Sequence, residues 1–250
     1  CVIINPMLKL SPIHCEKIWG YEDWIASTHK DGLQKDFYEF CGGEFPLLVK
    51  IIQSKDFLSV QVHPDDESAT RLEKAGAKGK TECWYVLEAD ENAKIVYGLN
   101  EVSSVEDLKK SIENGTFGHK LNYVRVKAGD FFFIPAGTIH AIGSGLKILE
   151  IQQSSNITYR IFDWNRGRKL DVEKALQVSS FHQCSSQGIV DGKFECEFFG
   201  FSIESLEFDK NLSFDAVTLV FDFRSQEMYC ARAGESVLLE PGRYMFIRAR

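Results

Sequence analysis

The stretch that decides the fold is AGDFFFIPAGTIHAIG, residues 128–143. Its apolar run FFFIP predicts a strand that begins after the turn at Gly129 and ends at Pro135. A second turn at Gly137 follows, and His140 comes three positions later. The spacing Gly129-x5-Pro135-x-Gly137-x2-His140 therefore predicts a turn that delivers His140 to the inner face of a β-barrel.

Short apolar runs, rich in aromatic and β-branched residues, surround this stretch. We predict strands at residues 45–52, 57–63, 83–89, 94–99, 122–128, 131–137 and 146–152, and further strands after about residue 190. Short strands at this spacing, divided by turn residues, are typical of a barrel or sandwich. Helices are expected at residues 64–76, which could also form a lid, at 103–115 and at 171–178. The second helix would be capped by Ser103 and Glu106, which have the capping-box spacing.

Composition excludes several classes of protein. The 250 residues include 29 Lys and Arg against 36 Asp and Glu, and the net charge of −7 argues against a nucleic-acid binder. No apolar run approaches the roughly 20 residues of a membrane helix, so no membrane partner is expected. Seven cysteines are scattered without a C-x-x-C pair, and the first residues lack a secretory signal. The sequence therefore predicts reduced thiols and a cytoplasmic location.

An internal repeat relates two parts of the chain. Residues 128–141 align without gaps with residues 233–246 at an offset of 105. Both segments have a Gly-acid turn, an apolar strand and a second Gly turn, which predicts a degenerate duplication of one barrel unit. Met245 stands where the first copy has His140, so the second barrel is expected to lack a polar centre.

Three separate segments offer metal ligands. Strand alternation places Gln61 and His63 on one face, while Glu82 precedes an apolar strand. An inward carboxylate costs several kcal/mol unless it is paired or bound to a metal. With His140, this set suits Zn²⁺, or Fe²⁺ and Mn²⁺, with a position open for substrate. The structural alternative is a strand-end His63 beside Asp65 and an exposed glutamate.

The chain resembles a known family of barrel proteins. The pattern at Gly129 to His140 is similar to the second signature of the cupins. FPLLVKIIQSKDFLSVQVHPDDE, GKTECWYVLEA and LEIQQSSNITYRIFDWNR, with the opening stretch, resemble the short bacterial form of the type I phosphomannose isomerases over about residues 45–166. This implies an all-β protein of cupin (jelly-roll) barrels with a few short helices. Residues 1–180 would form the metal-binding barrel with N-terminal strands, and 181–250 a degenerate C-terminal barrel.

The resemblance also implies an activity and a set of site residues. The activity is an aldose–ketose isomerisation that interconverts mannose 6-phosphate and fructose 6-phosphate. One Zn²⁺ per chain would be held by Gln61, His63, Glu82 and His140. The implied catalytic residues are Arg160, Glu150 and Lys80, and the implied substrate-binding residues are Lys50, Ser59 and Arg160.

The residue chemistry agrees with this activity. Isomerisation through an enediolate needs a base, a group that stabilises the oxyanion and a phosphate clamp. Glu150 lies in an apolar strand, where desolvation would raise its pKa and favour its role as the base. Lys50, Lys80 and Arg160 supply local positive charge in an acidic protein. The alternative for Glu150 is a purely structural salt bridge with Arg160.

Two other functions remain open from the sequence. One is a cupin oxygenase that uses Fe²⁺, although the three cations argue against a neutral substrate. The other is a catalytically weak sugar-phosphate sensor, because the segment KIWGYEDWIASTHKDG (17–32) is shorter than the family's and lacks its second glycine. In each reading the partner is a small molecule, and the chain is expected to be a monomer or a weak homodimer.

Overall fold

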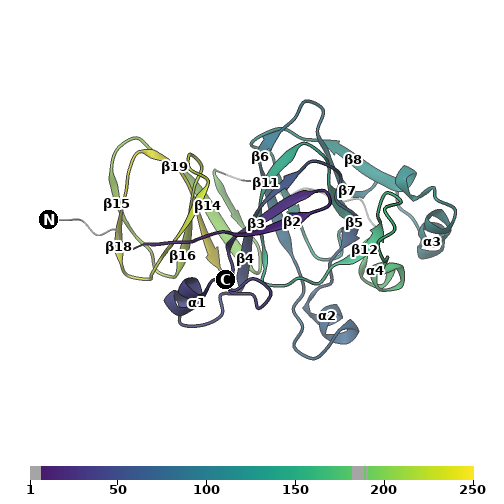
Figure 1. Ribbon diagram of the computed structural model, residues 1–250, viewed down its shortest axis with the longest axis horizontal. Helices are drawn as coiled ribbons and strands as arrows, with labels where there is room; N and C mark the ends of the chain where they lie inside the picture. Colours follow the sequence, from purple (N-terminus) through teal and green to yellow (C-terminus); the bar gives the residue numbers. More distant parts are fainter. Residues whose placement is uncertain (1–6, 182–188, 190) are drawn as a thin grey trace. The chain divides into compact units, whose positions relative to one another are not determined.

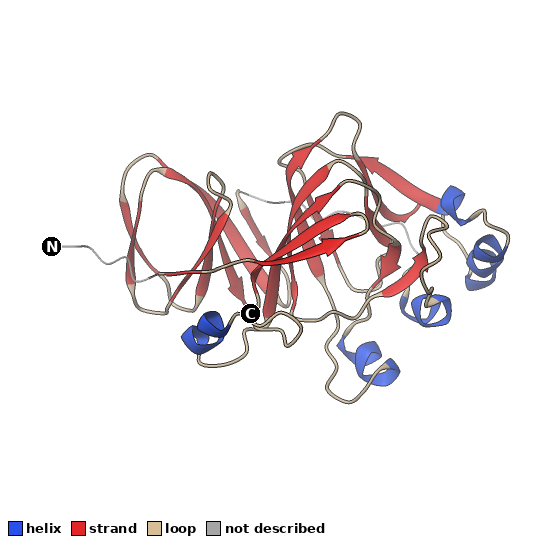
Figure 2. Ribbon diagram, in the orientation of Figure 1, coloured by secondary structure: helices blue, strands red, loops and turns tan. Residues whose placement is uncertain are grey.

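The protein is described by a computed structural model that covers residues 7–181, 189 and 191–250. Strands dominate it, and the helices are short (Figure 2). The strands are β1 (Leu8–Lys9), β2 (Ile13–Lys17), β3 (Gly20–Ala26), β4 (Leu47–Ser54), β5 (Val60–Val62), β6 (Glu82–Ala89), β7 (Lys94–Leu99), β8 (Leu121–Arg125), β9 (Phe131–Ile134), β10 (His140–Ile142), β11 (Leu146–Gln153), β12 (Tyr159–Phe162), β13 (Lys193–Glu195), β14 (Phe199–Leu206), β15 (Lys210–Ser213), β16 (Thr218–Asp222), β17 (Glu227–Ala231), β18 (Ser236–Leu239) and β19 (Gly242–Ala249). The helices are α1 (Lys35–Cys41), α2 (Asp66–Leu72), α3 (Val105–Glu113), α4 (Val172–Val178) and the 3₁₀ helix η1 (Phe117–Lys120).

The seven predicted strands and three predicted helices are confirmed, with shifted ends. Strand β9 ends at Ile134 because Pro135 has no N–H for the ladder. The predicted cap of α3 was wrong by one residue: Ser104, not Ser103, accepts a hydrogen bond from the backbone N–H of Asp107. The short strands β10 and β12 and the helix α1 were not predicted, since each is brief and lacks a strong apolar period.

Contacts divide the chain into two compact units. The central unit comprises residues 15–22 and 51–187, and the terminal unit comprises residues 1–14, 23–50 and 188–250, in each case for the described residues. The predicted domain division between residues 180 and 181 stays a prediction, although residues 23–50 group with the C-terminal strands.

Strands of two antiparallel sheets enclose the core of the central unit. One sheet has the order β12-β5-β10-β7-β8. The other has the order β2-β3-β4-β11-β6-β9, of which β11, β6 and β9 lie wholly in the central unit. A single buried cluster draws on both sheets, with Trp84 of β6 and Ile148 of β11 against Ile95 of β7 and Ile142 of β10. The unit is therefore a two-sheet jelly-roll barrel with its side chains packed between the sheets.

The outer face of the five-stranded sheet is covered by helices. Val60 and Val62 belong to a second cluster, which also contains Leu108 of α3 and Leu176 of α4. Figure 1 shows α3 and α4 outside the strands, near β8 and β12. Because side chains alternate along a strand, Gln61 between the two valines faces the opposite side, toward the interior. Because the helices cover the face that carries Val60 and Val62, the polar side chain of Gln61 lies on the interior face of β5.

The terminal unit contains the second copy of the predicted repeat. Its sheet has the order β1-β17-β16-β19-β14-β13, and β15 pairs with β18. Strand β18 lies 105 residues after β9 at both ends, as the repeat predicts. Gly129 and Gly234, also 105 apart, have φ values of 90° and 75°, a left-handed conformation that favours glycine. These coincidences support the predicted duplication.

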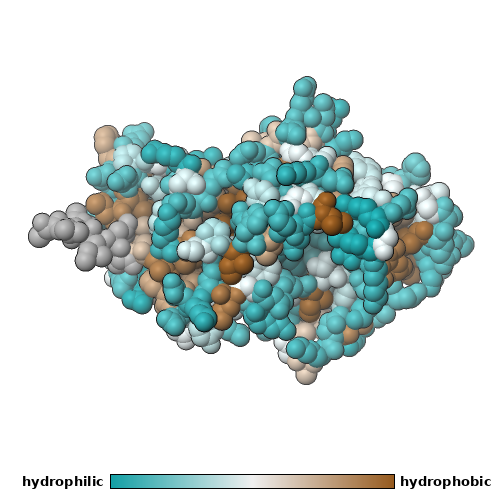
Figure 3. Space-filling model, in the orientation of Figure 1, coloured by the Kyte–Doolittle hydropathy of each residue, from teal (hydrophilic) through white to brown (hydrophobic). Residues whose placement is uncertain are grey.

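The surface shows few large apolar side chains. On the face in Figure 3 hydrophilic residues predominate, and the apolar areas are small. The exposed large hydrophobic residues, such as Ile18, Val102 and Phe208, come from separate segments of the described chain. No helix among the described residues has the length and apolarity needed to cross a membrane.

Candidate metal centre

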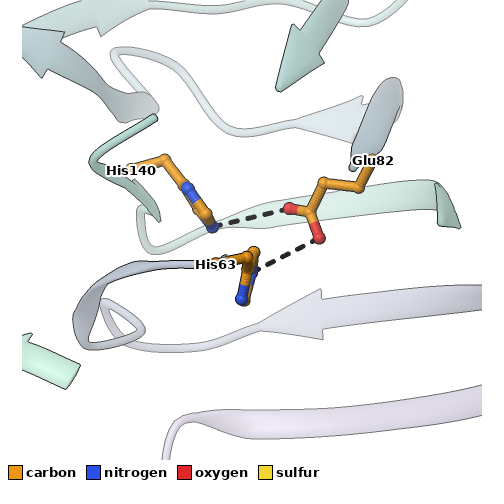
Figure 4. Close-up of side chains that lie close together, drawn as sticks. All are labelled: His63, Glu82 and His140. Atoms are coloured by element: carbon orange, nitrogen blue, oxygen red, sulfur yellow. Dashed lines mark ion pairs between the residues drawn. The ribbon is translucent and has the colours of Figure 1, made fainter. Parts of the chain in front are cut away.

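Three strands bring two histidines and one glutamate together. His63 directly follows β5, Glu82 is the first residue of β6, and His140 is the first residue of β10. All three side chains are buried, with exposed fractions of 1% or less. Figure 4 shows the two rings converging on the carboxylate. The sequence prediction that these three residues meet is confirmed.

The spacing of the donor atoms suits a metal ion. Nε2 of His63 lies 3.5 Å from Oε2 of Glu82, and Nε2 of His140 lies 3.5 Å from Oε1 of Glu82. Around a tetrahedral zinc ion with bonds of about 2.0–2.1 Å, neighbouring donor atoms lie about 3.3–3.4 Å apart. One ligand atom from each of the three residues lies within 4.8 Å of the other two, so a single ion could be bound by all three.

Backbone carbonyls fix the tautomer of both histidines. Nδ1 of His63 donates to the carbonyl oxygen of Ile157 at 2.9 Å, and Nδ1 of His140 donates to that of Thr138 at 2.8 Å. Because a carbonyl can only accept, each Nδ1 carries a proton, and in the neutral ring Nε2 then keeps its lone pair. Burial also lowers the pKa of His140 to about 4, so its ring is neutral near pH 7. Both conditions favour metal binding.

The donor set fits a divalent cation. Two neutral imidazoles and one carboxylate are common ligands of zinc and also suit Fe²⁺ and Mn²⁺. Glu82 is fully buried and contributes a negative charge that a cation would share with Lys80. By the chemistry of their donor atoms, the residues present therefore fit a resident metal.

Gln61, the fourth predicted ligand, lies beside His140. The two residues are partners in the β5–β10 register, and Nε2 of Gln61 is 3.4 Å from Nε2 of His140. A metal binds the amide oxygen rather than the nitrogen, so ligation requires the opposite orientation of this amide. Ligation by Gln61 stays a prediction.

Lys80 extends the site as a buried cation. Its Nζ lies 2.6 Å from Oε2 of Glu82, 3.7 Å from Oε1 of Glu150 and 3.3 Å from Nε2 of His63. Burial opposes the charged form, but the charges of Glu150 and Glu82 outweigh it and raise the pKa of Lys80. Lys80 is thus a protonated amine that can donate hydrogen bonds.

Glu150 lies opposite Trp84 in the β11–β6 register. Nε1 of Trp84 donates to Oε2 of Glu150 at 3.2 Å, and both side chains are buried. Trp84 was not among the predicted site residues, although the period of two places it on the same strand face as Glu82. Gln152 was not predicted either; it is fully buried and is the register partner of Glu82. In the sequence, Gln152 and Gln153 are adjacent polar residues at the end of an apolar strand, and this pattern could have indicated Gln152.

Arg160 lies next to the centre on β12. It is the register partner of Gln61, and its Nη1 donates to the carbonyl oxygen of Lys169 at 2.9 Å. Partial burial and the charge of Arg168 lower its pKa. Within the described residues Arg160 forms no ion pair, so the alternative of a Glu150–Arg160 salt bridge has no support.

For Ser59 and Lys50, the two remaining predicted residues, the structure shows burial and local contacts. Ser59 is buried just before β5. Lys50 is a buried residue of β4, and its Nζ lies 5.3 Å from the ring centroid of Trp24, a cation–π contact. Their roles in substrate binding stay predictions.

Comparison with known proteins identifies the family. Residues 7–97 match the family model for the catalytic domain of type I phosphomannose isomerase. A Streptococcus mutans protein named mannose-6-phosphate isomerase is 54% identical over 217 residues, which cover 70% of this chain and 67% of that protein. Mannose-6-phosphate isomerase ManA of Bacillus subtilis is 45% identical over 213 residues, covering 68% of this chain and 67% of that protein.

Solved structures agree on the fold. The crystal structure of a mannose 6-phosphate isomerase from Bacillus subtilis superposes with a TM-score of 0.81 and covers 97% of this chain and 99% of that one, at 24% identity. A putative mannosephosphate isomerase from Archaeoglobus fulgidus gives a TM-score of 0.77 at 20% identity, covering 99% of each chain. The family model and the sequence relatives, with which this fold agrees, show that the chain belongs to the type I phosphomannose isomerase family.

Proposed function

We propose that this protein interconverts mannose 6-phosphate and fructose 6-phosphate and holds one Zn²⁺ per chain. The observation that carries the proposal is the buried group of His63, Glu82 and His140 beside Lys80 and Glu150. The named relatives support the substrate, since two of them with 54% and 45% identity are mannose-6-phosphate isomerases.

The reaction moves one proton between neighbouring carbons. Glu150 accepts the proton from C2 of the open-chain aldose as the C2–H bond breaks. The electron pair of the broken C2–H bond forms the C1–C2 double bond of an enediolate, and the negative charge passes to O1. The hydroxyl proton of O2 passes to O1, the protonated Glu150 returns a proton to C1, and the ketose forms at C2. The carboxylate ends ionised, so the cycle balances.

The charged residues have separate parts in this proposal. Zinc, when bound, supplies Lewis-acid stabilisation of negative charge on the sugar oxygens. Lys80 would donate a hydrogen bond to the same developing charge. Arg160 would bind the phosphate or the oxyanion with its planar guanidinium. Lys50 and Ser59 would complete the binding of the phosphorylated sugar.

We also propose a cytoplasmic location. The substrate carries a phosphate, whose charge prevents passive passage through a bilayer. The described cysteines, among them Cys83 and Cys230, are free thiols, as is typical of a reducing compartment. The oligomeric state, a monomer or a weak homodimer, stays a prediction.

A coupled assay of mannose 6-phosphate turnover tests the function. We expect activity that is lost on chelation and recovers on addition of Zn²⁺. Metal-loaded protein that binds the sugar phosphate without turnover would instead identify the sensor. Oxygen consumption without isomerisation would identify the oxygenase. The named relatives favour neither alternative.

A further inference from the structure

Trp84 joins two parts of the proposed site. It lies in the middle of β6, two residues after Glu82, and has an exposed fraction of 1%. Its indole N–H reaches Oε2 of Glu150 at 3.2 Å. Its ring meets the ring of His140 edge-on, with centroids 5.4 Å apart and an angle of 76°. One side chain thus contacts both the proposed base and a proposed metal ligand.

The hydrogen bond holds Glu150 in one orientation. An indole N–H is a donor only, and a buried donor requires an acceptor. Oε2 of Glu150 fills that need, while Oε1 faces Nζ of Lys80 at 3.7 Å. The carboxylate thus has a neutral hydrogen-bond donor at Oε2 and a charged ion-pair partner on the side of Oε1. Rotation about its last bond would lengthen the contact with Trp84.

Orientation matters because proton transfer is short-ranged. A general base must lie about 2.6–3.2 Å from the atom whose proton it takes, and small displacements reduce the rate strongly. The indole ring is packed in the core of the barrel and cannot follow a moving carboxylate. The contact with Trp84 engages Oε2, whereas Oε1 lies on the side of Lys80.

From these contacts we infer that Trp84 is a positioning residue for the isomerisation, acting through its N–H on the carboxylate of Glu150. The inference rests on the proposed function, and it assigns Trp84 no contact with substrate. Its edge contact with His140 depends on the ring, so removal of the N–H alone separates the two contacts.

Two replacements at position 84 test the inference. Trp84→Phe removes the N–H and part of the ring. Site-specific incorporation of 3-benzothienylalanine keeps the size and shape of the bicyclic ring but replaces the N–H by sulfur, so the fold is preserved. Trp164→Phe is the matched control, since its indole N–H donates to the carbonyl oxygen of Leu58 at 2.7 Å elsewhere in the same unit.

We expect both replacements at Trp84 to lower kcat by about 10- to 100-fold, as the loss of one hydrogen bond to a charged group would. KM for mannose 6-phosphate and zinc content should stay near those of the unmodified enzyme. The primary isotope effect on kcat with substrate deuterated at C2 should increase, because proton transfer then limits turnover more strongly. Trp164→Phe should change neither kcat nor the isotope effect.

Other results would overturn the inference. If the benzothienyl enzyme has the kcat of the unmodified one, ring shape rather than the N–H is what matters. Loss of zinc in both enzymes would show that Trp84 supports only His140. Failure of the proposed function is seen separately, as metal-loaded unmodified protein that does not turn over mannose 6-phosphate.

Discussion

At the scale of single residues, the metal centre depends on which nitrogen of each imidazole carries its proton. The carbonyls of Ile157 and Thr138 settle this for His63 and His140. Both rings therefore present Nε2 to the carboxylate of Glu82. Two backbone groups, neither recognisable in the sequence, thus prepare the ligands before any metal binds.

Removal of one ligand should empty the centre. We expect purified His140→Ala to retain much less than one zinc per chain, because two protein donors leave the coordination sphere incomplete. His119 is an exposed histidine outside the site, so His119→Ala is the control and should retain the metal. Elemental analysis of the purified proteins measures both. Stoichiometric zinc in His140→Ala would remove this residue from the site.

Arg160 should affect catalysis without affecting the metal. We expect Arg160→Ala to lower kcat/KM by about 100-fold, close to 3 kcal/mol, as the loss of a charge-assisted contact in a closed site would. Arg160→Lys should restore only a part, since an ammonium cannot bind two oxygens as a planar guanidinium does. Zinc content should be unchanged in both variants. Normal kinetics in Arg160→Ala would assign the phosphate to another cation.

At the scale of elements, helix α3 shows how local chemistry sets a boundary. Ser104 Oγ accepts from the N–H of Asp107 at 3.1 Å and donates to the Asp107 carboxylate at 2.9 Å. Ser103 Oγ is buried and has no hydrogen-bond partner among the described residues. Both serines precede an acidic residue by three positions, which is why the sequence did not separate them.

Adjacent serines provide a matched test of this cap. We expect Ser104→Ala to destabilise the protein by about 1 kcal/mol, the usual cost of losing an N-cap. The thermal unfolding midpoint would fall by about 2–4 °C for a chain of this size. Ser103→Ala should be neutral or slightly stabilising, because it removes an unsatisfied hydroxyl. Equal losses in the two variants would contradict the observed cap.

At the scale of the whole molecule, the two copies of the repeat differ in what surrounds equivalent positions. His140 pairs in register with Gln61 and Tyr97, whereas Met245 pairs with Ile203 and Phe221. The central residue and its two register partners can form hydrogen bonds in the first copy, whereas all three are apolar in the second copy. Met245 is fully buried, so the second copy has an apolar packed core at the position where the first copy could bind a metal.

This difference predicts a single metal per chain. We expect the protein with alanine at His63, Glu82 and His140 to hold no tightly bound zinc, because the terminal unit offers apolar groups at its equivalent centre. Metal analysis after dialysis against a weak chelator measures this, with the unmodified protein as the reference. A second zinc that survives all three substitutions would refute the duplication with loss of the site.

Local patterns in the sequence determined the strands and their inward faces, and they singled out His63, Glu82 and His140 as candidate ligands. Strand alternation and turn residues act over a few positions, so a sequence pattern reveals them directly. The resemblance in the signature motifs then indicated the family, which the comparisons confirm.

Tertiary structure alone decided which side chains meet across strands. The bond between Trp84 and Glu150 joins residues 66 positions apart, and alternation predicts the face of each but not its partner. The carbonyls that orient the histidines come from backbone groups, which every residue carries. Pairing and register follow from packing of the whole barrel, because a shift of one residue would move every side chain to the other face.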